Sequence, residues 1–337
     1  MKLKVILGLL CIGVILSCRK NNPVTPVVYH QDGEVSKLYY NNPDGVNIVV
    51  FGDGFVKDDL KQGGNYDTQV KKVIDYLFTV APFRQNKQYF NSYVVYAESA
   101  KKGAAHGFDP NNTSTRFQSY FDTKIQRLLV AGNYDTCYKY VEKAVPLSKA
   151  HLIVLLVNDD TYGGSGGSMA VVSTNELSKY VLVHETGHTL GGLGDEYVDS
   201  VAADQYSLSV VPFLPNIDIN GDPKQTKWAY FLNYSAYQRI VGAFEGGYYR
   251  AKGYYRPEAH TTMSDLSYAN YNAPSREAIV KRIDQIVNIP YDFNSFLKND
   301  AASIQPVRIG VSNIPLIKND FIQMKDKILL LQKNKYH

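Results

Sequence analysis

Residues 181–197 read VLVHETGHTLGGLGDEY, a short stretch that combines two histidines with three acidic side chains. Side chains four residues apart lie on the same side of a helix, so His184 and His188 can direct two imidazole nitrogens at one point, with Glu185 beside them. Apolar residues upstream keep the opposite face of this helix in the core: Leu177, Val181 and Leu182. The pattern predicts a zinc site with a general base next to it.

A third protein ligand is expected downstream, because catalytic zinc sites use three protein ligands and keep one position for water or substrate. Gly191 or Gly192 can adopt the left-handed conformation that ends a helix and reverses the chain. The reversal would bring a carboxylate back to the metal, and we expect Asp195 in this role. Glu196 is the alternative, because a shift of one residue in the helix end exchanges the side chain that points inward.

The region before this motif alternates between strand and helix patterns. Buried strands are predicted at residues 46–51, 92–97 and 151–157, and helices at residues 67–80 and 116–129. This alternation predicts an α/β (α+β) fold in which helices cover a mixed, twisted sheet.

A glycine-rich segment leads into the motif. Residues 162–167 predict a flexible turn, residues 168–173 an edge strand, and Glu176 the start of the helix that carries the histidines. If this edge strand borders the cleft, an extended substrate could add to it through backbone hydrogen bonds.

Several segments together resemble the immunoglobulin A peptidase family of zinc endopeptidases, which is metzincin-like. They are residues 184–197, Gly-Asp-Gly-Phe at 52–55, Asn158 and Asp159 with residues 162–167, and Phe-Glu-Gly-Gly at 244–247 leading to Tyr-Arg-Pro at 255–257. The resemblance covers about residues 47–289, and the Gly-Leu-x-Asp-Glu-Tyr extension after the histidines is its most selective part.

The resemblance implies a metzincin-like zinc-peptidase fold with an active-site helix and a methionine turn beneath the zinc. Thr-Met-Ser at 262–264 is the matching segment, with Met263 at the turn. Some relatives carry cysteines shortly after it, whereas this chain has Asn272 and Ser275. This departure affects a local cross-link and not the chemistry.

The first residues predict export and lipidation. Lys2 and Lys4 precede an apolar run at residues 5–16, which is too short to be a membrane span. Residues 15–18, Ile-Leu-Ser-Cys, resemble the lipobox of bacterial lipoproteins, in which the cysteine becomes the lipidated N-terminus. Several acyl chains on Cys18 would anchor the protein stably to a membrane of the bacterial cell envelope, facing the periplasm or the cell surface.

The predicted organisation therefore has four parts. A signal peptide at residues 1–17 precedes a lipidated cysteine and tether at 18–28, a catalytic domain at 29–305, and a tail at 306–337 that we expect to form a helix packed on the domain.

Charge and cysteine usage exclude other classes of protein. The formal charge of +4 falls to +2 when Lys2 and Lys4 leave with the signal peptide, and no cluster of Lys and Arg supports nucleic-acid binding. With Cys11 in the signal peptide and Cys18 lipidated, Cys137 is the remaining thiol, which excludes a disulfide scaffold.

Other motifs are interpreted as structural. Residues 216–221 resemble half of a calcium loop, but Lys227 stands where a bidentate glutamate is needed, so a solvated turn is favoured. His106, His151 and His260 are interpreted as structural residues, and none of the 27 tyrosines is assigned a role.

The function predicted from these features is a membrane-anchored zinc metalloendopeptidase. It would cleave extracytoplasmic proteins or peptides through a zinc-activated water, with Glu185 as general base and then acid. The alternative is a catalytically inactive lipoprotein of the same fold that acts as a binding protein or adhesin. Because His184, Glu185 and His188 are all present, the sequence favours the enzyme.

Overall fold

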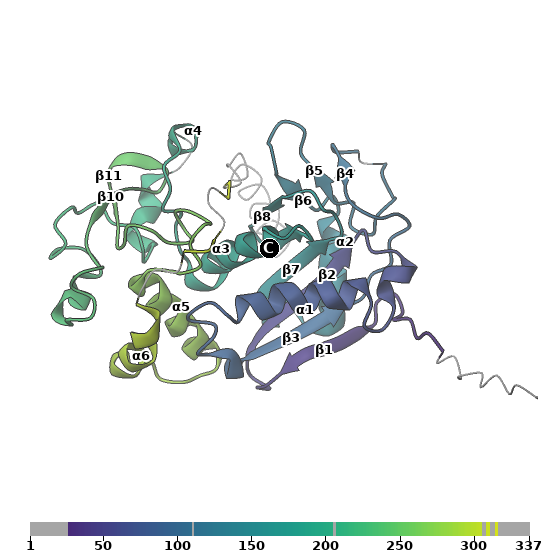
Figure 1. The fold of residues 1–337 in the computed structure, drawn as a ribbon, viewed down its shortest axis with the longest axis horizontal. Coiled ribbons are helices and arrows are strands. Elements are labelled where there is room, and N and C mark those ends of the chain that lie inside the picture. Colours follow the sequence, from purple (N-terminus) through teal and green to yellow (C-terminus); the bar gives the residue numbers. More distant parts are fainter. Residues whose placement is uncertain (1–25, 110, 205–206, 305–307, 311–313, 316–337) are drawn as a thin grey trace, which may run out of the picture.

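The computed structural model describes residues 26–109, 111–204, 207–304, 308–310 and 314–315 (Figure 1). The predicted signal peptide, Cys18 and most of the tail lie outside these residues. In the part of the chain that is described, no helix has the length and apolar character needed to cross a membrane. The described end of the tail contacts the body, because Ile314 is buried and the Tyr162 hydroxyl donates to the Pro315 carbonyl at 2.9 Å.

A mixed six-stranded sheet in the order β1-β3-β2-β7-β9-β8 forms the centre of the fold. The four inner strands are parallel, and the two outer strands are antiparallel to their neighbours. The strands of this sheet are β1 (Val35–Tyr40), β2 (Val46–Asp53), β3 (Phe90–Val95), β7 (Leu152–Val157), β8 (Gly164–Ser165) and β9 (Ala170–Ser173). The predicted mixed α/β fold is confirmed, and the predicted strands at 46–51, 92–97 and 151–157 correspond to β2, β3 and β7.

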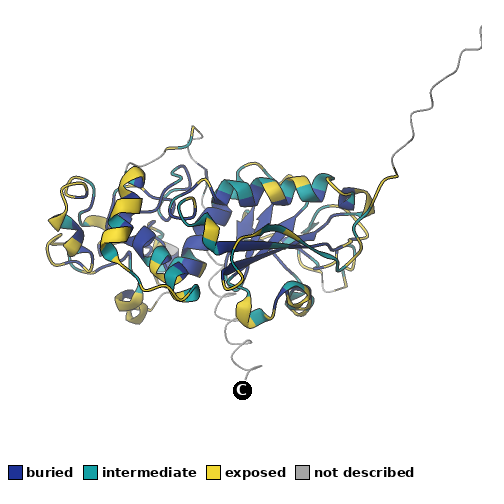
Figure 2. Cartoon of the chain, turned by 90° about the horizontal axis from the view of Figure 1, so that it is seen from below, coloured by how far each residue is buried: buried dark blue, intermediate teal, exposed yellow. Residues whose placement is uncertain are grey.

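Helices cover both faces of the sheet, and the alternation of side chains along β2 shows which helix lies on which face. Ile48 and Val50 belong to the core shared with α1, α3 and α5, whereas Val49 and Phe51 face α2. The helices are α1 (Asn65–Leu77), α2 (Tyr134–Ala144), α3 (Ser178–Gly191), α4 (Ser200–Ala203), α5 (Ala273–Ile286) and α6 (Phe293–Asp300). In Figure 2 the sheet is dark blue between helices whose outer faces are exposed.

Two small sheets lie outside this core. One contains β4 (Ala105–His106), β5 (Tyr120–Phe121) and β6 (Leu129–Val130), and the other is the hairpin of β10 (Phe244–Gly247) and β11 (Arg250–Arg256). The hairpin lies with α4 at the left of Figure 1, beyond the helix α3.

The predicted helix at residues 116–129 is wrong, because this segment forms β5 and the start of β6 with irregular chain between them. The buried Asp53 carboxylate accepts hydrogen bonds from the Phe117 and Ser119 backbone N–H groups, which therefore do not enter a helical ladder. Positive φ angles at Gln118 and Arg127, +56° and +70°, break any helix there.

The predicted edge strand at residues 168–173 is also placed wrongly. Its strand, β9, lies inside the sheet between β7 and β8, and β8 forms the edge. The glycine-rich segment folds back on β9 as an antiparallel strand and takes the outer position. The following helix, α3, begins at Ser178 rather than at Glu176.

Candidate metal centre

The helix α3 carries both histidines of the motif and is buried along most of its length. Its inner face packs in the core through Val181, Leu182 and Leu190. It ends at Gly192, whose φ of +61° lies in the left-handed region that favours glycine. The Gly192 N–H donates to the His188 carbonyl at 3.1 Å, and the chain then turns back along the helix. The predicted reversal is therefore present.

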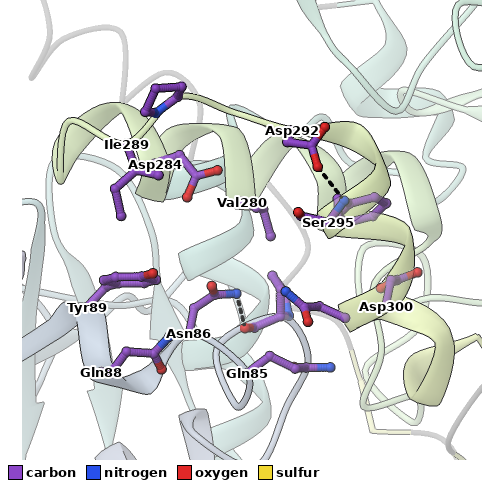
Figure 3. Close-up of a pocket in the computed structure, with 14 residues that line it drawn as sticks. Gln85, Asn86, Gln88, Tyr89, Val280, Asp284, Ile289, Asp292, Ser295 and Asp300 are labelled. Atoms are coloured by element: carbon purple, nitrogen blue, oxygen red, sulfur yellow. Dashed lines mark hydrogen bonds between the residues drawn. The ribbon is translucent and has the colours of Figure 1, made fainter.

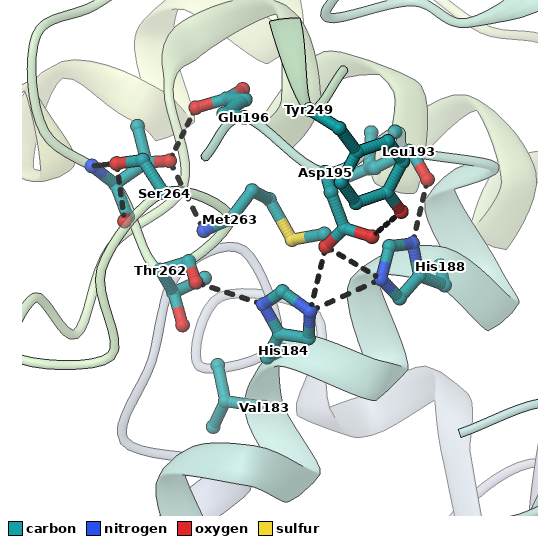
Figure 4. Close-up of polar contacts among 12 residues, drawn as sticks. Val183, His184, His188, Leu193, Asp195, Glu196, Tyr249, Thr262, Met263 and Ser264 are labelled. Carbon is teal, nitrogen blue, oxygen red and sulfur yellow. Dashed lines mark hydrogen bonds and ion pairs between the residues drawn. The ribbon is translucent and has the colours of Figure 1, made fainter. Parts of the chain in front are cut away.

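The reversal brings Asp195 to the two histidines. Its Oδ1 lies 3.0 Å from His184 Nε2 and 3.3 Å from His188 Nε2, and the two Nε2 atoms lie 3.1 Å apart (Figure 4). His184 and Asp195 are buried, and His188 is partly exposed. One ligand atom from each residue therefore meets the others at a single point.

Each imidazole is oriented by a backbone carbonyl behind it. His184 Nδ1 donates to the Thr262 carbonyl at 2.9 Å, and His188 Nδ1 donates to the Leu193 carbonyl at 2.7 Å. Since a carbonyl only accepts, Nδ1 carries the hydrogen in both rings and the Nε2 lone pairs face the common point. This is the tautomer that a metal-binding histidine needs.

The electrostatics of the cluster favour a positive charge at this point. Burial alone would lower the pKa of His184, but the negative charge of the adjacent Asp195 outweighs it and raises the pKa to about 9. Burial would raise the pKa of Asp195, yet the charges of His188 and His184 hold it well below its usual range. Asp195 Oδ1 is buried and receives no hydrogen bond, so it remains free to bind a cation. The donor set of two imidazoles and one carboxylate fits zinc.

Glu196 lies in a different network, although it follows Asp195 directly. Its carboxylate is buried and accepts hydrogen bonds from Asn216 Nδ2 at 2.7 Å, Asn272 Nδ2 at 2.5 Å and Thr261 Oγ1 at 2.5 Å. Burial raises the pKa of Glu196 to about 7. Of the two carboxylates that the sequence leaves open, Asp195 is the one that meets the histidines.

Met263, at the expected methionine turn, packs against α3 between the two histidines. It is fully buried, and a β-carbon on Gly187 would lie 2.9 Å from its Sδ. The backbone N–H of Glu196 donates to the Met263 carbonyl at 2.8 Å. The methionine turn therefore supports both the helix between the two histidines and the segment that carries Asp195.

Glu185 follows His184 on α3 and lies against the glycine-rich segment. A β-carbon on Gly166 would lie 1.5 Å from Glu185 Oε2, so only a glycine leaves room for this carboxylate. Among the described residues, no hydrogen bond to the Glu185 carboxylate is found. No side chain of the described residues therefore holds this carboxylate in place by a hydrogen bond.

Other motif residues do not reach the centre. Asp53 and Asp159 accept hydrogen bonds from the backbone of neighbouring loops, and His260 stacks on Tyr268 with ring centroids 4.7 Å apart. Asp218 Oδ1 accepts from the backbone N–H groups of Ile219 and Asn220, as in a turn. The predicted solvated turn is nevertheless wrong for its first half, because Asn216, Ile217 and Asp218 are buried. These groups support the loops around the site.

Three residues that hold the acidic side chains at or beside the centre were not predicted from the sequence. Asn216 and Thr261 hold Glu196, and the Tyr249 hydroxyl donates to Asp195 Oδ2. No local signal identifies them, because Asn216 lies in an apparent turn motif and Tyr249 is one of 27 tyrosines.

A separate cavity of about 200 Å³ lies between α5, α6 and the segment that follows α1 (Figure 3). Its lining includes Gln85, Tyr89, Asp284 and Asp292 and shares no residue with the histidine cluster. It is therefore not part of the candidate centre.

Comparison with known proteins agrees with the geometry. The chain matches the model of a family described as IgA Peptidase M64 over residues 40–237 and 231–283. Among solved structures, the crystal structure of metalloproteinase-II from Bacteroides fragilis is similar at 17% sequence identity with a TM-score of 0.25, over 55% of this chain and 52% of that chain. The match thus spans about half the length of that metalloproteinase. The comparison with curated proteins gives no match.

Proposed function

Because the chain belongs to the IgA peptidase M64 family, we propose that it is a zinc-dependent endopeptidase that hydrolyses peptide bonds of proteins outside the cytoplasm. The observation that carries this proposal is the convergence of His184, His188 and Asp195, whose ligand atoms all lie within 4.8 Å of one another next to Glu185. Bound zinc supplies a Lewis acid that lowers the pKa of a water molecule and polarises a carbonyl group.

The chain itself holds the three ligands in place before the metal arrives. The Thr262 and Leu193 carbonyls fix the two imidazole rings, and the methionine turn fixes the segment of Asp195. Little reorganisation is then needed on binding, which favours affinity.

Glu185 is the proposed general base and acid. It follows His184 directly, and its carboxylate accepts no hydrogen bond from the described residues. It is therefore available to take a proton from the attacking water and to pass it to the leaving amine.

Anchoring through Cys18 in the bacterial cell envelope is part of this proposal and is supported by the N-terminal sequence alone. A Cys18→Ala variant expressed in a bacterium is expected to leave the membrane fraction. Equal retention of the variant and the wild type in that fraction would contradict lipid anchoring.

The enzymatic proposal is tested on the purified protein by elemental analysis for zinc and by cleavage of a mixed peptide library. We expect about one zinc per chain and a cleavage rate that falls roughly 10²- to 10⁴-fold in Glu185→Gln, with zinc retained. Glu176→Gln is the matched control, because Glu176 is exposed and pairs with Lys72 on the surface.

Three outcomes would contradict the enzyme. They are a protein without zinc, cleavage that does not depend on Glu185, and zinc binding without cleavage of any peptide. The last would support the alternative of an inactive binding protein.

A further inference from the structure

The turn between β10 and β11 has an unusual backbone for its sequence. Gly247 and Arg250 face each other in the hairpin, so Tyr248 and Tyr249 form a two-residue loop. Their φ angles are +47° and +68°. Two-residue loops with two positive φ angles favour Asn-Gly and related pairs, because a large side chain is strained there. The loop therefore holds two bulky residues in a backbone conformation that glycine would adopt more easily.

Both side chains point into the protein. Tyr248 and Tyr249 are 5% and 3% exposed, and the Tyr249 ring packs edge-on against Tyr197 at 5.2 Å between centroids. Strained backbone that persists in a packed structure is a frequent sign of a functional constraint.

The Tyr249 hydroxyl donates a hydrogen bond to Asp195 Oδ2. Figure 4 shows the phenol ring above the carboxylate, on the side away from His184. Asp195 Oδ1, by contrast, receives no hydrogen bond and is the oxygen that lies within 3.3 Å of both histidines. The two oxygens of one carboxylate thus have separate partners.

The backbone of the turn also holds the segment of Asp195. The Tyr248 N–H donates to the Asp195 carbonyl at 2.8 Å, and the Tyr249 N–H donates to the Tyr197 carbonyl at 3.0 Å. The Asp199 N–H returns a bond to the Tyr249 carbonyl at 2.8 Å. The loop therefore fixes both the main chain and the side chain of the third candidate ligand.

We propose that Tyr249 is a positioning residue for the metal: its hydroxyl occupies Asp195 Oδ2 and presents Oδ1 alone to the ion. This inference rests on the proposed function, because it concerns the same zinc site. Partners of this kind orient a ligating carboxylate, and their loss typically weakens metal affinity 10- to 100-fold.

The test compares zinc affinity, measured by competition with a chelator, in the wild type and in Tyr249→Phe. Phenylalanine keeps the ring that packs on Tyr197 and removes only the hydroxyl. We expect the dissociation constant for zinc to rise roughly 10- to 100-fold. Tyr254→Phe is the matched control, because Tyr254 is 9% exposed in the same apolar cluster and has no hydrogen bond to Asp195 among the described contacts. Its zinc affinity should equal that of the wild type.

Cobalt(II) substitution separates positioning from general destabilisation. If Asp195 rotates or binds through both oxygens, the visible d–d absorption bands of cobalt-loaded Tyr249→Phe will change in position or intensity, while those of Tyr254→Phe will not. A purely structural role would lower the melting temperature and leave both the zinc affinity and the cobalt spectrum unchanged. That result would overturn the inference.

The two proposals fail in distinguishable ways. If the wild type binds zinc and cleaves peptides while Tyr249→Phe binds zinc with the same affinity, only the role of Tyr249 is wrong. If the wild type itself does not bind zinc, the proposed function fails and the inference fails with it.

Discussion

A β-carbon on Gly166 would lie 1.5 Å from Oε2 of Glu185, so the glycine-rich segment and the candidate base occupy adjoining space without a gap. The clashing atom is the end of a flexible side chain, and Gly166 does not have a positive φ angle. A larger residue there would therefore displace Glu185 rather than unfold the protein.

We predict that Gly166→Ala lowers peptide hydrolysis roughly 100-fold, because a displacement of about 1 Å at a reacting group can cost this much. Zinc content and melting temperature should change little. Gly310→Ala is the control, since a β-carbon at Gly310 meets no atom within 4 Å. Full activity in Gly166→Ala would show that the position of Glu185 does not matter for the reaction.

Asp195 and Glu196 are adjacent in sequence but should respond differently to truncation. Asp195→Ala removes a proposed ligand, so we expect loss of zinc from a protein that remains folded. Glu196→Ala leaves the side chains of Asn216, Thr261 and Asn272 without their buried acceptor and should lower the free energy of unfolding by about 2–4 kcal/mol. Elemental analysis measures the zinc content of both variants, and urea unfolding measures their free energies of unfolding. The assignment is wrong if Asp195→Ala keeps its zinc.

The helix that carries the site could be predicted from the sequence because its information is local. The four-residue spacing of His184 and His188 and the glycine at 192 are sufficient for a shared ligand point and a reversal. The alternation of buried strands likewise predicted β2, β3 and β7. Each of these features depends on residues close together in the chain.

The features that could not be predicted depend on distant contacts. Residues 116–129 have a helical pattern, but Asp53, more than sixty residues upstream, binds their backbone. The partner of Asp195 Oδ2 is Tyr249, which lies 54 residues downstream in the turn between β10 and β11. The periodicity of the sequence carries no information about such long-range contacts, so features that depend on them could not be predicted from it.

Arg276 and Asp300 join α5 to α6 by a buried ion pair, with Nε–Oδ1 and Nη2–Oδ2 distances of 2.6 and 2.8 Å. Because both residues are almost fully buried, Asp300→Ala leaves the Arg276 guanidinium without its hydrogen-bonded carboxylate and should lower the free energy of unfolding by about 3–5 kcal/mol. The double variant Arg276→Met/Asp300→Ala should lose less than the sum of the two single variants. Urea unfolding of the four proteins measures the coupling, and simple additivity would contradict it.

His151 should make stability depend on pH. It precedes β7, and its Nδ1 accepts a hydrogen bond from the Asn47 backbone N–H at 3.0 Å. Burial and the positive charges of Arg282 and Lys149 lower its pKa from 6.5 to about 4. Between these two values the unfolded chain binds a proton that the folded chain does not, so the free energy of unfolding must fall as the pH falls.

We therefore predict that acidification from about pH 7 to about pH 5 destabilises the wild type more than His151→Gln, since glutamine can keep an acceptor for Asn47 but binds no proton. Burial raises the pKa of Glu196 and of Glu258 to about 7, so their contributions to stability decrease as the pH rises from 4.5 to 7 and oppose that of His151. The difference between wild type and His151→Gln cancels these contributions, because both glutamates are present in both proteins. Urea unfolding across this range gives the two slopes, and parallel slopes would mean that His151 binds its proton equally in the folded and unfolded chains.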